Sequence, residues 1–246
     1  MSPKRLTAKD FDHRILELYD YYAHGKITKR EFLKNTAKYT AVGVTALSVF
    51  DSLKPNYALA EQVNFNDPEI KANYITYNSA NGNGDINAYY VKPAKVTDKT
   101  SAVLVIHENR GLNPYIKDVA RRVAKAGFIA LAPDGLSSLG GYPGNDAEGK
   151  ILQKKIDREK LLNDFFNAFE FLLNHQDTNK KIGAVGFCYG GGVCNALAVA
   201  YPELSASVPF YGSQTRSEDV KKIKTPLLLH YAEFDERINK GWPEYE

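Results

Sequence analysis

The 246-residue sequence predicts an α/β fold in which a mostly parallel sheet carries helices on both faces. From residue 70 onward, segments of strand character alternate with segments of helical periodicity, which is the pattern of a βαβ chain. The strand candidates at 102–107 and 128–132 are almost wholly apolar, as strands buried on both faces must be. The composition, 43% hydrophobic and 25% charged, matches a globular protein and excludes disordered and disulfide-dense classes.

The predicted elements follow one another in a regular order. Residues 73–78 and 86–91 are expected to be two strands joined by Asn81-Gly82-Asn83-Gly84, a turn signal typical of antiparallel hairpins. After this hairpin the sequence predicts, in chain order, a strand at 102–107, a helix at 115–126, a strand at 128–132, a loop rich in Gly, Ser and Pro at 134–149, an amphipathic helix at 157–174, a strand at 181–187, a helix at 190–201, and strands at 205–211 and 226–231.

The first sixty residues are expected to be a leader or an N-terminal extension of the main domain at 61–246. The segment Thr28-Lys29-Arg30-Glu31-Phe32-Leu33-Lys34 precedes a short apolar stretch at 41–50, and Ala58-Leu59-Ala60 then supplies a small-x-small cleavage site. This order resembles a twin-arginine export signal in which Lys29 replaces the first arginine. The alternative is an uncleaved helical extension, because residues 11–22 carry apolar side chains at helical spacing.

A functional leader would make the export machinery a partner and place the protein in the periplasm; otherwise we expect it in the cytoplasm. The positive charge lies in this part of the chain. Residues 1–60 hold ten Lys and Arg against six Asp and Glu, whereas residues 61–246 hold 22 against 23. The main domain therefore lacks the basic footprint of a nucleic-acid-binding protein. The apolar run at 41–50 is far shorter than the ~18–20 residues that cross a bilayer, so no stable membrane span is expected.

The turn between the strand at 181–187 and the next helix is expected to carry the chemistry. It contains Gly186-Phe187-Cys188-Tyr189-Gly190, the G-x-C-x-G form of a nucleophile elbow. Glycines are needed two positions on either side of the nucleophile, because a side chain there would meet neighbouring backbone. The helix N-terminus favours a reactive thiolate at Cys188, and the backbone N–H of Tyr189 would point at an oxyanion.

Two alternatives to the elbow remain. A glycine-rich turn at a helix N-terminus can hold phosphate, but here no Walker Lys-Ser/Thr pair follows the glycines. Cys188 could also be a buried structural cysteine. Cys194, six residues further along the helix, faces away from Cys188 and is expected to be a core thiol.

A nucleophilic cysteine needs a base and an acid that orients the base, in the chain order nucleophile, acid, histidine. Asp235, just after the strand at 226–231, is the predicted acid, and Glu233 is the fallback. No histidine follows them. The five histidines are expected to lie elsewhere: His13 and His24 in the leader, His107 at a strand end near the site, His175 on the surface and His230 in the core. We therefore expect a C-terminally truncated chain that lacks the last helix, strand and helix and, with them, the base.

The sequence resembles the dienelactone hydrolase family of α/β-hydrolases. The elbow, His107-Glu108 leading to Gly111, Ala132-Pro133-Asp134 and the segment PLLLHYAEFD at 226–235 carry the resemblance. It implies an α/β-hydrolase fold and the opening of enol-lactone esters through an acyl-cysteine. It further implies Cys188 as nucleophile, Asp235 as acid, Glu108 as a carboxylate that modulates the thiol, and the backbone N–H groups of Asn109 and Tyr189 as the oxyanion hole.

Other features of the family place limits on this resemblance. Family members hold the substrate carboxylate with an arginine soon after the Ala-Pro-Asp segment, whereas the loop at 135–142 contains none. Dienelactone itself is therefore not the expected substrate. Arg237 is a weak substitute and is expected on the surface. Glu108 has an alternative role as a loop carboxylate paired with Arg110.

Three functions remain open. The first is a carboxylic-ester or lactone hydrolase with a small-molecule substrate and without a metal or an organic cofactor. The second is an inactive remnant of such an enzyme, for which poor solubility is expected because missing elements would leave apolar sheet surface uncovered. The third is a binding module that uses the pocket above Cys188.

Overall fold

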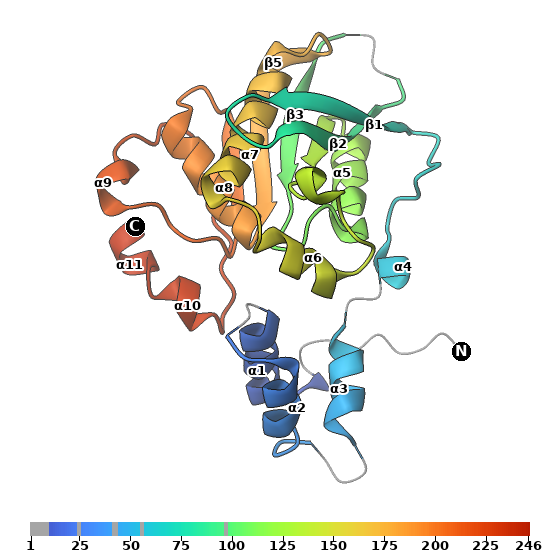
Figure 1. Cartoon of the computed structure of the whole chain (residues 1–246). Helices are drawn as coiled ribbons and strands as arrows, with labels where there is room; N and C mark the ends of the chain where they lie inside the picture. The colour runs from blue at the N-terminus through green and yellow to red at the C-terminus, as the bar shows by residue number, and fades with distance from the viewer. Residues whose placement is uncertain (1–9, 24–25, 41–43, 55–56, 96–97) are drawn as a thin grey trace. The chain divides into compact units, whose positions relative to one another are not determined.

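The computed structural model of the chain describes residues 10–23, 26–40, 44–54, 57–95 and 98–246 (Figure 1). The chain divides into two compact units, Met1–Ala60 and Glu61–Glu246. None of the helices in the described ranges is both long enough and apolar enough to cross a membrane.

The described part of the first unit is helical. Its helices are α1 His13–Ala23, α2 Lys29–Thr36, α3 Ala46–Leu53 and α4 Tyr57–Ala60. The helix expected from the apolar spacing at 11–22 is therefore present as α1. Residues 41–43 of the apolar stretch that we expected in a leader lie outside the described residues.

The segment that resembles an export signal forms a capped helix with a buried aromatic residue. Thr28 Oγ1 accepts a hydrogen bond from the backbone N–H of Glu31 (3.2 Å), and the Glu31 carboxylate accepts one from the backbone N–H of Thr28 (2.7 Å). This reciprocal pair is a capping box, which starts α2. Phe32 is fully buried, with ring centroids 5.9 Å from Tyr19 and 5.5 Å from Phe50.

The second unit is built around one six-stranded sheet. Its strands, whose bounds are given at the end of this paragraph, lie in the order β1-β2-β4-β3-β5-β6. The predicted hairpin is confirmed, because β1 and β2 are antiparallel and Ser79 pairs with Gly84 beside the turn. The β2–β4 pair is also antiparallel, whereas β4–β3, β3–β5 and β5–β6 are parallel. The strands are β1 Ile70–Ser79, β2 Gly84–Pro93, β3 Thr100–Ile106, β4 Ile129–Pro133, β5 Thr178–Phe187 and β6 Ala206–Phe210.

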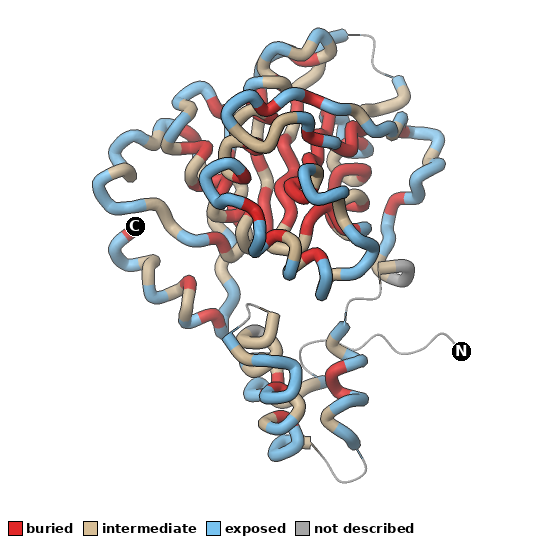
Figure 2. Tube along the Cα trace, viewed as in Figure 1, coloured by how far each residue is buried: buried red, intermediate tan, exposed pale blue. Residues whose placement is uncertain are grey.

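Helices cover both faces of this sheet, so the predicted α/β class is confirmed (Figure 1). Helix α5 (Pro114–Lys125) packs on one face, and α7 (Arg158–Asn174) and α8 (Tyr189–Ala200) pack on the other. The apolar positions predicted for the amphipathic helix 157–174 face the sheet, with Leu161, Phe165, Phe169 and Leu172 almost fully buried. In Figure 2 the buried residues are concentrated in the strands and on the helix sides that face them.

The loop predicted at 134–149 is wrong in part. It contains a short 3-10 turn, Ser137–Leu139, and its last residues begin helix α6 (Asp146–Gln153). Asn145 caps α6 by accepting a hydrogen bond from the backbone N–H of Glu148 (2.9 Å), which is a local signal for a helix start. Three short helices after β6 were also not predicted: α9 Ser217–Val220, α10 Glu236–Asn239 and α11 Trp242–Tyr245.

The strand predicted at 226–231 is also wrong, because the segment runs beside β6 without a continuous ladder. Isolated parallel bridges join Ser207 to Leu227 and Phe210 to His230. Between these bridges β6 presents Pro209, which has no N–H to donate, so the ladder is interrupted there.

His230 is correspondingly not a core residue. Its side chain is exposed and stacks on the Phe210 ring, with the ring centroids 4.2 Å apart. The neighbouring Leu228 is 58% exposed, since no strand among the described residues pairs with the outer edge of this segment.

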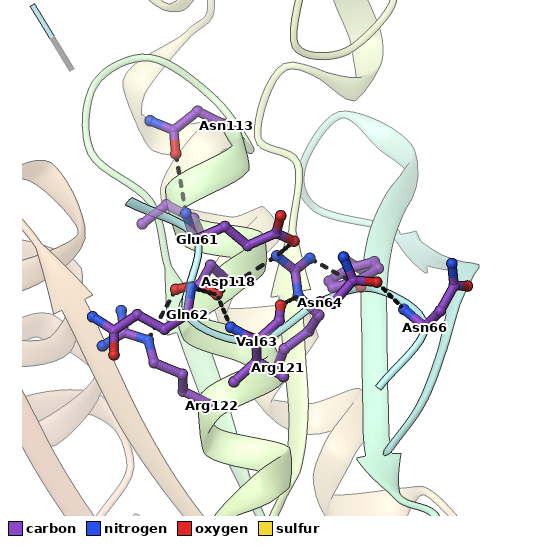
Figure 3. Close-up of polar contacts among 11 residues, drawn as sticks. Glu61, Gln62, Val63, Asn64, Asn66, Asn113, Asp118, Arg121 and Arg122 are labelled. Carbon is purple, nitrogen blue, oxygen red and sulfur yellow. Dashed lines mark hydrogen bonds and ion pairs between the residues drawn. The ribbon is translucent and has the colours of Figure 1, made fainter. Parts of the chain in front are cut away.

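Charged residues of α5 hold the first residues of the second unit (Figure 3). The Asp118 carboxylate accepts hydrogen bonds from the backbone N–H groups of Gln62 (3.0 Å) and Val63 (2.9 Å). Arg121 Nε donates to the Val63 carbonyl oxygen (2.5 Å), and its terminal nitrogen donates to Glu61 (2.9 Å). Asp118 and Arg121 are both buried, so these charge-assisted bonds are shielded from water. We call this set of contacts the Asp118 clamp.

Removal of the Asp118 carboxylate should destabilise the second unit. Asp118→Ala removes one of the two carboxylates beside the buried Arg121 and leaves two backbone N–H groups without an acceptor, which we expect to cost about 3 kcal/mol in the free energy of unfolding. Urea titration followed by the fluorescence of Trp242, the only tryptophan, measures this unit. Lys125→Ala is the control, because its ion pairs with Asp67 and Glu69 are exposed and should contribute less than about 1 kcal/mol. Equal effects of the two changes would contradict the clamp.

Candidate active site

Cys188 occupies a strained turn between β5 and α8. Its backbone has φ 54° and ψ −111°, a region that residues with a side chain rarely adopt and that costs about 1–3 kcal/mol. The turn is fixed on both sides by backbone hydrogen bonds. The N–H of Cys188 donates to the Phe210 carbonyl (3.0 Å), and the N–H of Gly192 donates to the Cys188 carbonyl (3.2 Å). The predicted elbow conformation is therefore present.

The glycines around Cys188 lie where a Cβ atom could not fit. A Cβ on Gly186 would lie 2.1 Å from the Gly190 carbonyl oxygen, and one on Gly190 would lie 2.4 Å from the carbonyl oxygen of Ile106. A Cβ on Gly191 would lie 2.6 Å from the Phe210 carbonyl oxygen. The first turn of α8 thus packs directly against the backbone at the carboxyl ends of β3 and β6.

This packing places the two predicted oxyanion-hole groups at one edge of the sheet. Tyr189 is the first residue of α8, and Asn109 lies three residues after the end of β3. A Cβ on Gly190 would also lie 2.7 Å from the His107 carbonyl oxygen, so the start of α8 touches the segment that leads to Asn109. The N-terminus of α8 carries the partial positive charge of the helix dipole, which suits an anion there.

Glu108 is a partly buried carboxylate of the same edge. The Asn113 side-chain amide donates to its Oε2 (3.3 Å). Burial raises the pKa of Glu108 above its usual range, and the nearby Arg110 guanidinium opposes the rise. Tyr211 directly follows β6. Burial raises the pKa of its hydroxyl, and the charges of Glu108 and Cys188 add to that rise. Tyr211 therefore lies within electrostatic range of both residues.

Asp235, the predicted acid, is buried at the start of α10. Its Oδ1 accepts a hydrogen bond from the backbone N–H of Ile238 (3.2 Å), and its Oδ2 lies 3.7 Å from a guanidinium nitrogen of Arg237. Arg237, which we expected on the surface, is 27% exposed in its side chain. The fallback acid Glu233 is exposed.

His107 supports the structure of the site rather than offering a base to the thiol. Its ring is fully buried, with Nε2 accepting from the backbone N–H of Gly135 (3.0 Å) and Nδ1 lying 2.6 Å from the Glu108 carbonyl oxygen. Because Nε2 accepts, the proton belongs on Nδ1, which donates to the backbone carbonyl oxygen of Glu108. Burial lowers the pKa of this imidazole, so the neutral ring is favoured. His107 thus joins the end of β3 to the turn after β4.

The Ala-Pro-Asp segment fixes the neighbouring loops. The buried Asp134 carboxylate accepts hydrogen bonds from the backbone N–H groups of Leu112 (3.3 Å), Leu136 (3.0 Å) and Tyr142 (2.7 Å). The loop after β3 and the loop after β4 are therefore held by one side chain. In the sequence, Asp134 was only part of a motif shared with the family. Its structural role could not be predicted, because its partners are backbone N–H groups, which no sequence motif identifies.

Helix α6 brings residues to the site that we did not predict. Asp146 forms an ion pair with Arg110 at 3.1 Å and accepts a hydrogen bond from the Tyr142 hydroxyl (2.9 Å). Gly149 lies against the Arg110 carbonyl oxygen, where a Cβ would approach to 2.2 Å. Lys150 is half-buried, and burial, followed by the charges of Lys154 and Arg110, lowers its pKa to about 8. Since the helix itself was missed, its side chains could not be placed near Cys188.

Other candidate positions lie apart from this edge. Cys194 is fully buried in the core, as predicted, and is not in a disulfide. His175 ends α7 beside a surface hollow of about 560 Å³ whose lining includes Tyr77 and Phe171. Among the described residues, no group of three or more His, Cys, Asp or Glu side chains has an arrangement that suits a metal ion.

The close contact at Gly190 can be tested by adding one methyl group. Gly190→Ala should lower the free energy of unfolding by about 1–3 kcal/mol, because the Cβ overlaps backbone that cannot move freely. Gly192→Ala is the matched control, since its Cβ would meet nothing closer than 3.6 Å and alanine favours a helix by up to about 1 kcal/mol. Urea titration followed by Trp242 fluorescence measures both, and equal stability of the two variants would argue against the elbow packing.

Burial of Glu108 predicts a pH-dependent stability difference. With its pKa raised in the folded state, the carboxyl binds more protons folded than unfolded, so its contribution to stability falls as pH rises from the ordinary value of 4.5 through the raised value. Glu108→Gln removes this loss. Relative to wild type, the variant should gain stability as pH rises from 4.5 toward neutrality. A stability difference that is constant over this range would show that Glu108 is solvated. The exposed Glu148→Gln serves as the control.

Comparison with known proteins places this arrangement in a family. Residues 86–244 match the sequence model of the dienelactone hydrolase family, and residues 2–41 match a second model, described as YqhI-like. An Escherichia coli protein named as a hydrolase fragment, YghX, is 71% identical over 114 residues, which are 46% of this chain and 97% of that protein.

More distant relatives share a larger part of the chain. A Bradyrhizobium protein named as a probable 2-oxo-3-(5-oxofuran-2-ylidene)propanoate lactonase is 34% identical over 190 residues, 67% of this chain and 76% of that protein. The crystal structure of a dienelactone hydrolase from Anabaena variabilis has a similar fold, with a TM-score of 0.55 at 20% identity over 72% of this chain and 80% of that one. The mostly parallel sheet with helices on both faces is thus the α/β-hydrolase fold, and the chain belongs to the dienelactone hydrolase family.

Proposed function

We propose that the chain acts on a small-molecule carboxylic ester or lactone, with Cys188 as the nucleophile of an acyl-enzyme mechanism. The observation that carries the proposal is the strained backbone of Cys188, whose φ of 54° is maintained by backbone contacts that only glycine neighbours permit. Strain of this kind clusters at active sites, where it positions reactive groups. The lactonase name of the Bradyrhizobium relative supports the substrate class.

The reaction proceeds in two stages. The Cys188 thiolate attacks the carbonyl carbon, the C=O electron pair moves to oxygen, and the tetrahedral intermediate then expels the alcohol oxygen, which takes up a proton. This leaves a thioester on Cys188. Water attacks the thioester carbonyl, the C–S bond breaks, and the carboxylic acid leaves with the thiol restored. The net reaction consumes one water for each ester bond.

Backbone N–H groups of Tyr189 and Asn109 would stabilise the oxyanion of both stages. Tyr189 lies at the positive end of α8, so its N–H needs no reorganisation when the negative charge forms. Glu108 has the role of a carboxylate that modulates the resting thiol. Its burial favours the neutral carboxyl, which does not repel a thiolate nearby.

The base is the part of the proposal that the described side chains do not supply. His107 uses both ring nitrogens within the fold, and His230 stacks on Phe210 at the exposed edge. We propose that Asp235 has the role of the acid that orients the base, as the family resemblance implies.

A second candidate, an inactive remnant of the enzyme, is favoured by one observation. In the second unit, the ring of each histidine lies in a structural setting: the core at His107, the end of α7 at His175 and the edge of β6 at His230. A thiol without a base would still be acylated by an activated ester, but the thioester would be hydrolysed slowly. Acylation and turnover therefore separate the two candidates.

For residues 1–60 we propose an export leader of the twin-arginine type, removed after Ala60, and therefore a periplasmic protein. The Asp118 clamp supports this, because its contacts begin at Glu61 and would survive the cleavage. The alternative, an uncleaved helical extension, is supported by the capping box of α2 and by the burial of Phe32. The N-terminal residue of the protein isolated from its source distinguishes them.

The nucleophile is tested with p-nitrophenyl acetate. We expect one equivalent of p-nitrophenol in a rapid burst and an acetyl group on the Cys188 peptide in the mass spectrum. Cys188→Ala should abolish both signals, whereas Cys194→Ala should retain them because that thiol is buried. A burst followed by steady turnover supports the enzyme, and a burst without turnover supports the remnant. Failure of Cys188 to acylate faster than the urea-unfolded chain would contradict its role as nucleophile.

A further inference from the structure

The surface hollow of about 560 Å³ beside α7 has the size of a small-molecule site, for which volumes of about 300–1,000 Å³ are usual. Its lining comes from β1, from the second half of α7 and from the two residues that follow this helix. The described residues that line it include none from the turn at Cys188 or from α6. We call it the α7 hollow and treat it as a separate candidate site.

Aromatic rings form the apolar part of the lining. Tyr77 is 4% exposed, and its ring centroid lies 5.6 Å from that of Phe171, which in turn lies 5.2 Å from that of His175. The Tyr77 hydroxyl is used within the fold, because it donates to the Asp164 carbonyl oxygen (2.7 Å). The rings therefore contribute apolar surface and the partial negative charge of their faces, which attracts cations.

The polar part of the lining presents hydrogen-bond acceptors, because most of its amide donors are already used. The Nδ2 atoms of Asn167 and Asn174 each donate to the backbone carbonyl four residues earlier, at 2.7 and 2.9 Å, and Nδ2 of Asn78 donates to the Asp85 carboxylate (3.1 Å). These partners only accept, so each amide must turn its NH2 group toward them and keep its oxygen for another donor. None of the described residues donates to the three amide oxygens.

The charge around the α7 hollow is negative. Glu170 is the carboxylate of the lining, with Oε1 accepting from the Tyr201 hydroxyl (2.8 Å), and no lysine or arginine is among the described lining residues. Lys92 of the adjacent strand β2 is neutralised by Asp177 at 2.7 Å. The lining also includes the C-terminal end of α7, whose last turn has no basic residue. A helix C-terminus carries partial negative charge and favours a cation.

We propose that the α7 hollow binds a small organic cation whose N–H groups donate to the three amide oxygens and whose charge lies beside Glu170 and the aromatic rings. A guanidinium or primary ammonium group has this chemistry, because it combines a positive charge and several donors with no acceptor. A neutral sugar suits the lining less well. Its hydroxyls also accept, whereas three of the four side-chain amides among the described lining residues have donated already. The inference goes beyond the proposed function and does not depend on Cys188.

The first test compares methylguanidinium with N-methylurea, which has nearly the same shape but no charge and an additional acceptor. Binding to the isotope-labelled full chain is followed by NMR through the side-chain amide signals of Asn78, Asn167, Asn174 and Gln176. Methylguanidinium should give saturable shifts at millimolar concentration, whereas N-methylurea should bind at least about fivefold more weakly. Methyl β-glucoside, the polyol probe, should give no saturable shift.

The second test changes single lining residues. Glu170→Gln should weaken methylguanidinium binding about threefold to fivefold and leave N-methylurea binding unchanged, because only the charge is removed. Glu203→Gln is the matched control, since it makes the same change at an exposed carboxylate outside the lining. Phe171→Leu keeps an apolar side chain without a ring and should weaken methylguanidinium binding severalfold. Cys188→Ala should bind like wild type.

Several results would overturn the proposal. These are the absence of saturable shifts with methylguanidinium, equal or tighter binding of N-methylurea or the glucoside, and equal affinities of Glu170→Gln and wild type. Loss of binding in Cys188→Ala would place the cation at the turn instead of the α7 hollow, and would also overturn it. The acylation of Cys188 by p-nitrophenyl acetate is a separate measurement, so failure of one proposal leaves the other standing.

Discussion

The approach of α8 to the carboxyl ends of β3 and β6 is the constraint on which the site depends. Here β5 turns into α8 through a single residue with positive φ, Cys188. The helix can start so close to the sheet only because Gly190 and Gly191 present backbone without a Cβ to the carbonyl oxygens of Ile106 and Phe210. The same contact that strains Cys188 therefore brings the backbone N–H of Tyr189 to the end of β3, where Glu108 and Asn109 begin the next loop.

The loops around this contact are tied together by buried polar side chains whose hydrogen-bond partners are backbone groups. His107 joins the end of β3 to Gly135, and Asp134 joins the loop after β3 to the loop after β4. Both side chains are satisfied by backbone groups, so neither leaves an uncompensated polar group in the core. A polar residue at this edge of the sheet can thus serve the fold, because both ring nitrogens of His107 contact backbone groups.

The sequence was sufficient for the elements whose signals are local. The hairpin, the buried strands, the amphipathic helix α7 and the elbow were predicted because each rests on turn chemistry, periodicity or a short motif. Prediction from the sequence failed where the structure of a segment depends on residues far from it in the chain or on a signal that the sequence obscures. Pro209 of β6 interrupts pairing with 226–231, and a glycine within α6 conceals a helix that Asn145 caps. Missing α6 also meant missing Lys150 and Asp146, so the turn at Cys188 was predicted whereas the charged side chains of α6 were not.

The charged groups at this edge of the sheet come from elements other than the turn itself. Burial raises the pKa of Glu108, and the Arg110 guanidinium opposes the rise. The same guanidinium forms an ion pair with Asp146 of α6 at 3.1 Å, so the segment after β3 joins the charges of two elements. The strained turn is formed by β5 and α8, whereas these charges belong to the segment after β3 and to α6. The backbone geometry at Cys188 and the charges beside it are therefore carried by different elements of the fold.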